Sequence, residues 1–325
     1  QLEINIAVAD TPNRLYILEE LRKHTKVHFT IFVLDPSADT NEKDIFFLGE
    51  ECKVADLHEI ESILSARPRK PINQVATTMF TSGSTGLPKG VSFSNYNMLS
   101  KRFARAAAVP TIGNREVMLC FLPLFHTFGR FLELLGSMYW YGTYVFAGNT
   151  ASETLLSLFP KVNPSVFISI PLRWMQLYEN IMELVKPDDT REEILLKIRR
   201  IVGNRLHWGL SAAGYLEPKI FQFFQDHGIY LCSGFGMTEA TGGITMTPPA
   251  KYMESTTGIP LPGVKARFTK EGEMQINGHY IARYLEEAGP DDIINFPTAK
   301  KSDYWMPTGD IFRENSEGYL EIIDR

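Results

Sequence analysis

The sequence predicts an α/β protein: two parallel-sheet α/β subdomains packed together, followed by a small β subdomain near the C-terminus. Two observations predict this fold class. β-rich stretches alternate with amphipathic helical stretches over most of the chain, and after Gly258 the pattern changes to short strands separated by turns. The composition agrees, because 44% of the 325 residues are hydrophobic and 22% are charged, as in globular proteins with about two domains.

The first run of elements has the order of a parallel strand-helix-strand unit. We expect these elements at Ile4–Ala9, Pro12–His24 and Val27–Leu34. Thr11 is a good N-cap for the helix, and Pro12 suits its first position because proline there loses no hydrogen bond. A polar loop at 35–44 and a short amphipathic helix at 56–66 follow, and a β-rich stretch at 75–80 then leads into a loop rich in Gly and Ser.

A helix at 95–108 follows that loop, and from Glu116 the alternation resumes. Strands are expected at Val117–Leu122, Tyr144–Ala147, Ser165–Ile170, Leu206–Leu210 and Ile229–Ser233. Helices are expected at Phe128–Tyr141, Ser152–Phe159, Leu172–Val185, Arg191–Val202 and Glu217–His227. This pattern implies a second parallel sheet covered by helices. The predicted division is an α/β subdomain at 1–112, a second one at 113–250 and the β subdomain at 251–325.

Charge and cysteine content exclude several classes of protein. A net charge of −5 and a pI near 5.9 argue against a nucleic acid as the main partner. The three cysteines, Cys52, Cys120 and Cys232, lie far apart, which favours a reduced, cytoplasmic setting over a disulfide framework. The apolar tract Phe131–Phe146 is too short to span a bilayer, and we expect no signal peptide from the strand-like stretch that follows Gln1. Because the chain begins at Gln1 rather than Met, we expect an internal fragment.

The segment Phe80–Gly90, with the sequence FTSGSTGLPKG, is the most informative part of the chain. Its backbone N–H groups and hydroxyls can converge on one polyanion, although such clusters are also typical of plain turns. The Walker pattern fails, because Pro88 precedes Lys89 and a glycine follows it. The predicted order of strand, loop and helix is that of a phosphate site at the edge of an α/β sheet.

Three further segments of interest lie in the second half of the chain. Ser233–Glu239 (SGFGMTE) directly follows a predicted buried strand, which is where α/β sheets place ligand sites. Taken alone, however, its Thr-Glu pair is typical of a helix cap. Trp305–Asp310 (WMPTGD) contains a Thr-Gly-Asp that alone is an ordinary turn sequence. The run Ser211–Tyr215 (SAAGY) is equally typical of a tight turn before a helix and of a backbone that a flat ligand can approach.

In this order the motifs resemble those of the adenylate-forming enzymes, which include acyl-CoA synthetases, beetle luciferases and peptide-synthetase adenylation domains. The resemblance implies an ATP site in which Phe235 packs on adenine, Thr238 meets the α-phosphate, Glu239 ligates Mg²⁺ and Asp310 accepts hydrogen bonds from the ribose. The implied ATP- or AMP-binding residues are Thr81, Ser82, Gly83, Ser84, Thr85, Gly86, Lys89, Ala212, Ala213, Gly214, Ser233, Gly234, Phe235, Gly236, Met237, Thr238, Asp310 and Arg325.

Pro123–Gly129 (PLFHTFG) resembles the family segment whose histidine borders the acyl carboxylate and gates its entry; a lone His beside aromatic residues is otherwise typical of a core residue. The implied catalytic residues are Lys89, His126, Thr238 and Glu239. Amino-acid-activating relatives carry an Asp near this segment. Because no carboxylate occurs here before Glu133, an acid without an amino group is the expected substrate.

Three features of the chain are most similar to long-chain acyl-CoA synthetases: the apolar stretch at 131–146, the run TGDI at 308–311 and the run LEIIDR at 320–325. The resemblance implies that a fatty acid and ATP form an acyl-adenylate and pyrophosphate, after which coenzyme A takes the acyl group and AMP leaves. An aryl-acid or carrier-protein-directed enzyme and a non-catalytic nucleotide-binding remnant stay open as alternatives. The sequence leaves chain length, acceptor, oligomeric state and peripheral membrane contact open.

Family members carry a longer segment before the signature loop and, beyond a hinge at Ile322–Arg325, a small domain whose lysine contacts the adenylate. We therefore expect this chain to hold the nucleotide half of the site and to have little full activity. One departure from the family pattern is Ala282-Arg283-Tyr284, where a Gly often precedes the aromatic residue; it is interpreted as a local change in a β-turn.

Overall fold

The computed structural model describes residues 4–25, 27–35, 44–51, 56–69, 71–82, 88–285 and 304–324. The chain divides into two compact units, Gln1–Lys70 and Pro71–Arg325. The three-part division predicted from the sequence, with boundaries after residues 112 and 250, stays a prediction.

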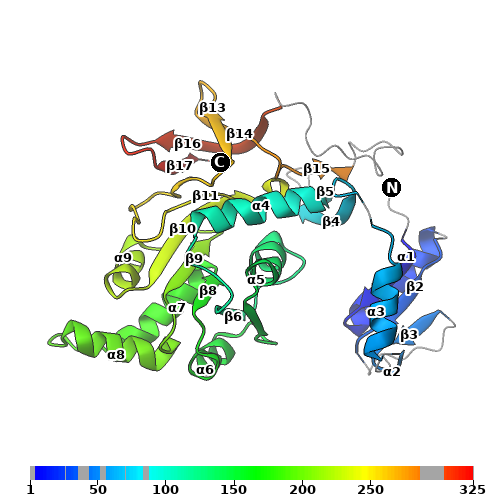
Figure 1. The fold of residues 1–325 in the computed structure, drawn as a ribbon, viewed down its shortest axis with the longest axis horizontal. Helices are drawn as coiled ribbons and strands as arrows, with labels where there is room; N and C mark the ends of the chain where they lie inside the picture. The colour runs from blue at the N-terminus through cyan, green and yellow to red at the C-terminus, as the bar shows by residue number, and fades with distance from the viewer. Residues whose placement is uncertain are drawn as a thin grey trace. The chain divides into compact units, whose positions relative to one another are not determined.

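The first unit is built on a parallel sheet with the strand order β1-β2-β3. Its elements are β1 (Ile6–Ala9), α1 (Pro12–Thr25), β2 (Thr30–Val33), β3 (Ile45–Phe47), α2 (Leu48–Glu51) and α3 (Leu57–Ala66) (Figure 1). Helix α1 packs on the sheet over a core that includes Ala9, Leu15 and Ile31. Asp56 caps α3, because its Oδ1 accepts the N–H of His58 at 2.6 Å. The predicted strand-helix-strand unit is confirmed.

The main sheet of the second unit has seven strands among the described residues, in the order β12-β11-β10-β9-β8-β6-β7. The strands are β6 (Val117–Cys120), β7 (Thr143–Phe146), β8 (Val166–Ser169), β9 (Trp208–Ala212), β10 (Tyr230–Met237), β11 (Gly242–Met246) and β12 (Ile259–Pro260). β6 to β10 are parallel, and β11 and β12 add antiparallel strands at one edge. The five predicted strands are thus present, with ends that differ by up to four residues.

Helices cover both faces of this sheet. They are α4 (Asn95–Ala108), α5 (Leu135–Trp140), α6 (Ser152–Val162), α7 (Pro171–Met182), α8 (Arg191–Val202) and α9 (Pro218–Asp226). The connection from β6 to β7 runs toward one edge of the sheet. The connections from β7 to β8, from β8 to β9 and from β9 to β10 run toward the opposite edge. Right-handed crossovers therefore place α5 on one face and α6, α7 and α9 on the opposite face, and α4 lies on the α5 side (Figure 1).

The predicted helix at 128–141 is divided into a π-helical turn, Phe128–Leu134, and the α-helix α5. The turn packs tightly on the chain that leaves β6: a Cβ at position 129 would lie 2.5 Å from the carbonyl oxygen of Pro123, so Gly129 fits here without a clash. Such π-helical turns are frequent at functional sites.

The described residues of the second unit also form two antiparallel sheets. One has the order β13-β14-β16-β17, and the other has the order β15-β5-β4. Their strands are β4 (Val75–Ser82), β5 (Pro88–Ser94), β13 (Lys265–Phe268), β14 (Glu273–Asn277), β15 (Arg283–Tyr284), β16 (Met306–Glu314) and β17 (Leu320–Asp324). The four-stranded sheet matches the predicted β-rich tail, and the α/β fold class is confirmed.

Two local predictions were wrong. The segment after the signature loop is a strand and not a helix. This strand, β5, pairs antiparallel with β4, from Val75 opposite Ser94 to Ser82 opposite Pro88. The predicted order of strand, loop and helix is therefore strand, loop and strand. The departure at 282–284 contains strand β15, which pairs with β5, where a β-turn was expected. In the described part of the chain, the helices are too short or too polar to cross a membrane.

Candidate active site

Strands β9 and β10 place two of the candidate segments side by side. They run parallel, with Ser233 opposite Ser211 and Gly234 opposite Ala212. Directly after β9, Ala213 has a left-handed φ of 65° and is exposed, as is the glycine that follows it. The small-residue turn and the motif that continues from β10 therefore lie at the carboxyl edge of one sheet, where α/β folds bind ligands.

The turn that follows β10 carries the candidate metal ligand. A short 3₁₀ turn, Thr238–Ala240, connects β10 to the antiparallel strand β11. Glycine fits at position 236 because a Cβ there would lie 2.4 Å from the carbonyl oxygen of Gly242. Thr238 and Glu239 are half-buried, so their side chains are held by the fold and remain within reach of a substrate.

Phe235 and the Thr-Gly-Asp motif come together through Phe312. The Phe235 ring lies edge-on to the Phe312 ring, with centroids 5.0 Å apart and planes at 69°. Asp310 precedes Phe312 by two residues on β16, and both side chains are buried. The Asp310 N–H donates to the Thr308 hydroxyl at 3.3 Å, which fixes the backbone at this point. The structure thus joins two motifs that are about 75 residues apart in sequence.

The signature lysine reaches the Thr-Glu motif through a residue to which the sequence assigned no role in the site. Lys89 lies on β5, and its Nζ is 5.4 Å from the centroid of the Tyr284 ring. The Tyr284 hydroxyl donates a hydrogen bond of 2.7 Å to Oε1 of Glu239. Thr81, the partner of Lys89 across the β4–β5 pair, donates its hydroxyl to the Lys89 carbonyl at 3.5 Å. Lys89, Tyr284 and Glu239 therefore form one contiguous cluster.

Several predicted residues lie outside the described residues, and their roles stay predictions: Gly83, Ser84, Thr85 and Gly86 of the signature loop, the side chain of Ser82, and Arg325.

His126 is exposed, in a turn where its N–H donates to the Pro123 carbonyl at 3.1 Å. Its Nδ1 accepts the N–H of Phe128 at 3.2 Å, and partial burial lowers the pKa of the ring. A neutral imidazole with its proton on Nε2 is therefore the favoured form. Arg130 was not predicted, yet it donates to the Leu124 carbonyl at 2.7 Å and to the Thr77 hydroxyl at 3.0 Å. It thereby ties the His126 turn to strand β4.

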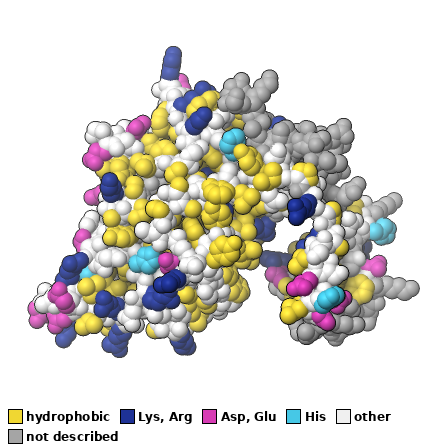
Figure 2. Space-filling model, in the orientation of Figure 1, with side chains coloured by type: hydrophobic (Ala, Val, Ile, Leu, Met, Phe, Trp, Pro, Cys, Tyr) yellow, Lys and Arg dark blue, Asp and Glu magenta, His cyan; other side chains and the backbone are white. Residues whose placement is uncertain are grey.

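The apolar stretch at 131–146 forms core and surface. Phe131 is buried and packs edge-on against Phe93, with centroids 4.9 Å apart. Hydrophobic side chains also gather on the surface over α4 and α5, where Phe103 and Met138 are exposed (Figure 2). Packing accounts for the buried residues of the stretch, so its apolar composition does not by itself identify an acyl-chain site.

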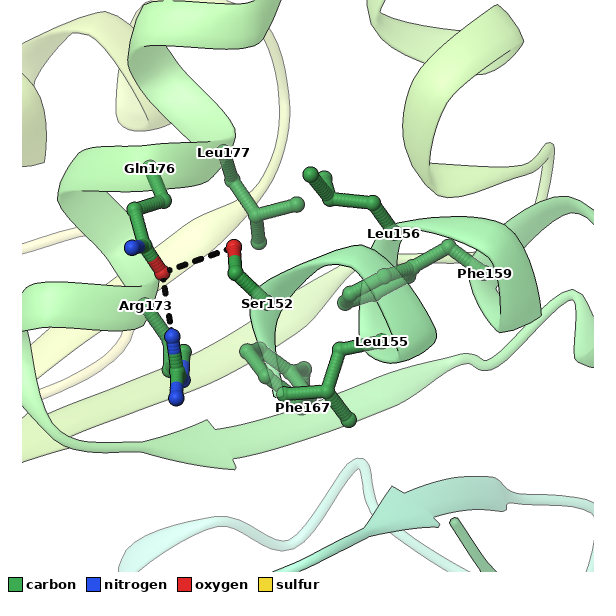
Figure 3. A pocket seen from close by; sticks show the side chains of 8 residues that line it. All are labelled: Ser152, Leu155, Leu156, Phe159, Phe167, Arg173, Gln176 and Leu177. Atoms are coloured by element: carbon green, nitrogen blue, oxygen red, sulfur yellow. Dashed lines mark hydrogen bonds between the residues drawn. The ribbon is translucent and has the colours of Figure 1, made fainter. Parts of the chain in front are cut away.

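A small cavity lies elsewhere in the second unit, between α6, β8 and α7. Its volume is about 10 Å³, room for about one water molecule. Leu155, Phe159 and Phe167 form its apolar wall, and Gln176 accepts hydrogen bonds from Ser152 and Arg173 beside it (Figure 3). None of these side chains belongs to the predicted site, and the cavity is a gap in helix packing.

Glu239 is the predicted metal ligand, and the described residues contain no cluster of three or more His, Cys, Asp or Glu side chains that could hold a metal ion by themselves. A single carboxylate fits Mg²⁺, which prefers oxygen ligands and is often held by one or two carboxylates together with substrate phosphates and water. The donor set is therefore compatible with a metal that arrives with its nucleotide.

Comparison with known proteins shows the family to which the chain belongs. A family model described as AMP-binding enzyme matches residues 3–280, and the chain belongs to that family. It is 25% identical to long-chain-fatty-acid–CoA ligase 5 of Mus musculus over 378 aligned positions, which cover 99% of this chain and 53% of the mouse protein. The chain thus spans about half the length of this relative.

Solved structures share the fold. The chain is similar to apo MatB from Rhodopseudomonas palustris, with a TM-score of 0.72 and 20% identity over 99% of this chain and 59% of MatB. It is also similar to the anthranilate CoA ligase AuaEII in complex with anthranoyl-AMP, with a TM-score of 0.71 and 16% identity over 99% of this chain and 58% of AuaEII.

Proposed function

We propose that the full-length protein containing this chain is an acyl-CoA synthetase that forms AMP. The observation that carries the proposal is the cluster of Lys89, Tyr284 and Glu239, which joins the signature hairpin to the Thr-Glu turn. Membership of the AMP-binding enzyme family supports it. An acid-thiol ligase needs both a polyphosphate site and a carboxylate that can take a magnesium ion, and this cluster offers one cation and one carboxylate in contact with a shared residue.

In the first half-reaction, a carboxylate oxygen of the acid attacks the α-phosphorus of ATP, and the bond from that phosphorus to the bridging oxygen breaks, so pyrophosphate leaves. Catalysis of this kind depends on positioning and on charge neutralisation. The Lys89 ammonium and the Thr81 hydroxyl bind the β- and γ-phosphates, the Thr238 hydroxyl binds the α-phosphate, and Asp310 holds the ribose. Mg²⁺ bound by Glu239 would offset the negative charge on the phosphates.

In the second half-reaction, the sulfur of coenzyme A attacks the acyl carbonyl, and AMP leaves with the electron pair of the broken carbon–oxygen bond. A long-chain fatty acid is the proposed substrate, supported by the name of the mouse relative. An aryl acid is the second candidate, favoured by the structural similarity to an anthranilate ligase. Location in the cytoplasm and dependence on Mg²⁺ belong to the same proposal.

Exchange of labelled pyrophosphate into ATP tests the first half-reaction. With the full-length protein we expect exchange that depends on a fatty acid and is abolished in Glu239→Ala. Glu179→Ala is the matched control, because Glu179 is an exposed carboxylate in the last turn of α7. Undiminished exchange in Glu239→Ala would refute the metal assignment. A series of acids of graded chain length, with anthranilate alongside, separates the two substrate classes: exchange with anthranilate alone would reject the fatty-acid assignment.

A further inference from the structure

The geometry points to Tyr284 as the residue that positions Glu239 for metal binding and holds the Lys89 ammonium apart from that carboxylate. The inference rests on the proposed function, because it concerns the same ATP site. The three side chains come from segments separated by as many as 195 residues, so their contact is a product of the fold.

Strand pairing explains why the Tyr284 ring meets Lys89. Tyr284 on β15 lies opposite Val91 on β5. Lys89 precedes Val91 by two residues on the same strand, so the two side chains share a face, and Lys89 is a diagonal neighbour of Tyr284. Diagonal neighbours are within reach of aromatic and long side chains, and the 5.4 Å from Nζ to the ring centroid is within the range of a cation–π contact.

The same segment holds Glu239 at two points. The N–H of Ala282 donates to the Glu239 carbonyl at 2.7 Å. Two residues later, the Tyr284 hydroxyl donates to Oε1 of Glu239, also at 2.7 Å. The first bond fixes where the backbone of Glu239 lies, and the second fixes the direction of its side chain.

Helix α4 and the turn after β10 anchor this segment in turn. The buried Asn97 side chain donates to the carbonyls of His279 at 2.8 Å and Ile281 at 3.1 Å. The Thr241 hydroxyl donates to the Tyr280 carbonyl at 2.5 Å. A residue that orients a functional side chain can do so only if it is itself held, and these three bonds supply that support.

Lys101 on α4 completes the support. Its Nζ donates to the Gly243 carbonyl and lies 3.7 Å from the centroid of the Tyr280 ring. The side chain is buried, which lowers its pKa well below the ordinary value of lysine. Lys101 thus joins the segment at 279–284 to strand β11, on the far side of the turn that carries Glu239.

This arrangement leaves the two charges of the site available to substrate. Lys89 and Glu239 are both described, and no ion pair within 4.0 Å joins them, because both contact the intervening tyrosine. A phenol is a neutral donor, so it orients the carboxylate without neutralising it. Hydrogen-bonding partners of this kind orient metal ligands, and their removal costs about 10- to 100-fold in metal affinity.

Calorimetric titration of ATP into the full-length protein, at graded Mn²⁺ concentrations and without acid substrate, tests the inference independently of turnover. Tyr284→Phe keeps the ring and removes the hydroxyl. We expect the Mn²⁺ concentration that half-saturates metal-dependent ATP binding to rise about 10- to 100-fold, with ATP affinity in the absence of metal unchanged. Tyr319→Phe is the matched control, because it also removes a tyrosine hydroxyl, but one that lies outside the site and donates to the Lys251 carbonyl at 3.0 Å. This variant should match the wild type.

Glu239→Gln, alone and combined with Tyr284→Phe, separates the possible outcomes. If Tyr284 acts through Glu239, the tyrosine substitution has no further effect on Mn²⁺ dependence in the Glu239→Gln background. Two results would overturn the inference. One is full additivity of the two substitutions in their effect on Mn²⁺ dependence. The other is a Tyr284→Phe variant with wild-type Mn²⁺ dependence while the Glu239→Gln variant has lost that dependence. Wild-type Mn²⁺ dependence in Glu239→Gln would instead overturn the metal assignment of the proposed function, and the role of Tyr284 with it.

Discussion

The buried Glu133 should make the stability of this protein fall as pH rises, and replacing it with glutamine should remove this contribution. Its side chain is 1% exposed, in the π-helical turn that follows the His126 segment. Burial raises the pKa of its carboxyl group from 4.5 to about 8, against the smaller opposing effect of the N–H groups of Leu122 and Phe121. One of these bonds, from Leu122 to Oε2, is 3.2 Å long, and a glutamine oxygen can accept it equally well.

The sign and size follow from proton linkage. The folded state binds a proton at Glu133 more tightly than the unfolded state does, so stability from the neutral acid is fully present below about pH 4.5 and is lost as pH rises through about 8. The difference between the two pKa values corresponds to about 5 kcal/mol over the whole range. Integration between pH 5 and 8 gives a loss of roughly 3 kcal/mol.

Urea denaturation measured from pH 5 to 8.5 tests this reasoning. The free energy of unfolding of Glu133→Gln, relative to the wild type, should rise by roughly 3 kcal/mol between pH 5 and 8. Glu179→Gln, at an exposed position in α7, should follow the wild type at every pH. Parallel curves for the wild type and Glu133→Gln would refute the claim that this buried carboxyl is neutral in the folded protein.

Two further predictions concern stability and are measured by urea denaturation at one pH. Gly209→Ala should lower the free energy of unfolding by about 1–3 kcal/mol, because the new Cβ would lie 2.4 Å from the buried Trp174 ring. Gly113→Ala is its control: the space around Gly113 is open, so the free energy of unfolding should change by less than about 0.5 kcal/mol. Ser94→Ala should lower the free energy of unfolding by about 1 kcal/mol, because it removes the capping box of α4. Ser157→Ala, at an exposed site within α6, removes no cap and should not lower it by this amount. Equal effects within either pair would contradict the structural reason given.

The parts of the fold that the sequence predicted best have strong local signals. The helices expected at 95–108 and 191–202 have those bounds in the structure, and both begin with a capping box, at Ser94 and at Thr190. A capping box satisfies two backbone N–H groups with nearby side chains, so its effect is visible in the sequence. The strand predicted at 206–210 lies instead at Trp208–Ala212, because alternation gives the presence of a strand more reliably than its ends.

The β4–β5 pair could not be predicted in the same way. Five consecutive residues of β5, from Gly90 to Ser94, are buried, so the strand lacks the alternation of polar and apolar residues that marks a half-buried strand. The glycine-rich loop before it instead suggested a helix N-terminus. The pairing of Tyr284 with Val91 depends on how segments nearly 200 residues apart meet, and no local pattern contains that information.

The candidate site shows the same limit. The motifs identified Phe235, Glu239 and Asp310 one at a time, and the structure connects the first to the third through Phe312. Tyr284 carries a weak signal in the sequence, because the departure from the family pattern at 282–284 includes it, but that departure predicts a turn and indicates no role for the tyrosine.

The proposed reaction requires charges in the candidate site that do not cancel one another before substrate arrives. Had the Lys89 ammonium and the Glu239 carboxylate formed a direct ion pair, binding of a nucleotide phosphate would first have to break it. The aromatic ring between them makes a weak contact with the cation and a hydrogen bond with the anion, so each charge stays oriented and unneutralised. The antiparallel sheet β15-β5-β4 is what allows this, because strand pairing places Tyr284 beside Lys89 while the Ala282 N–H holds the Glu239 backbone.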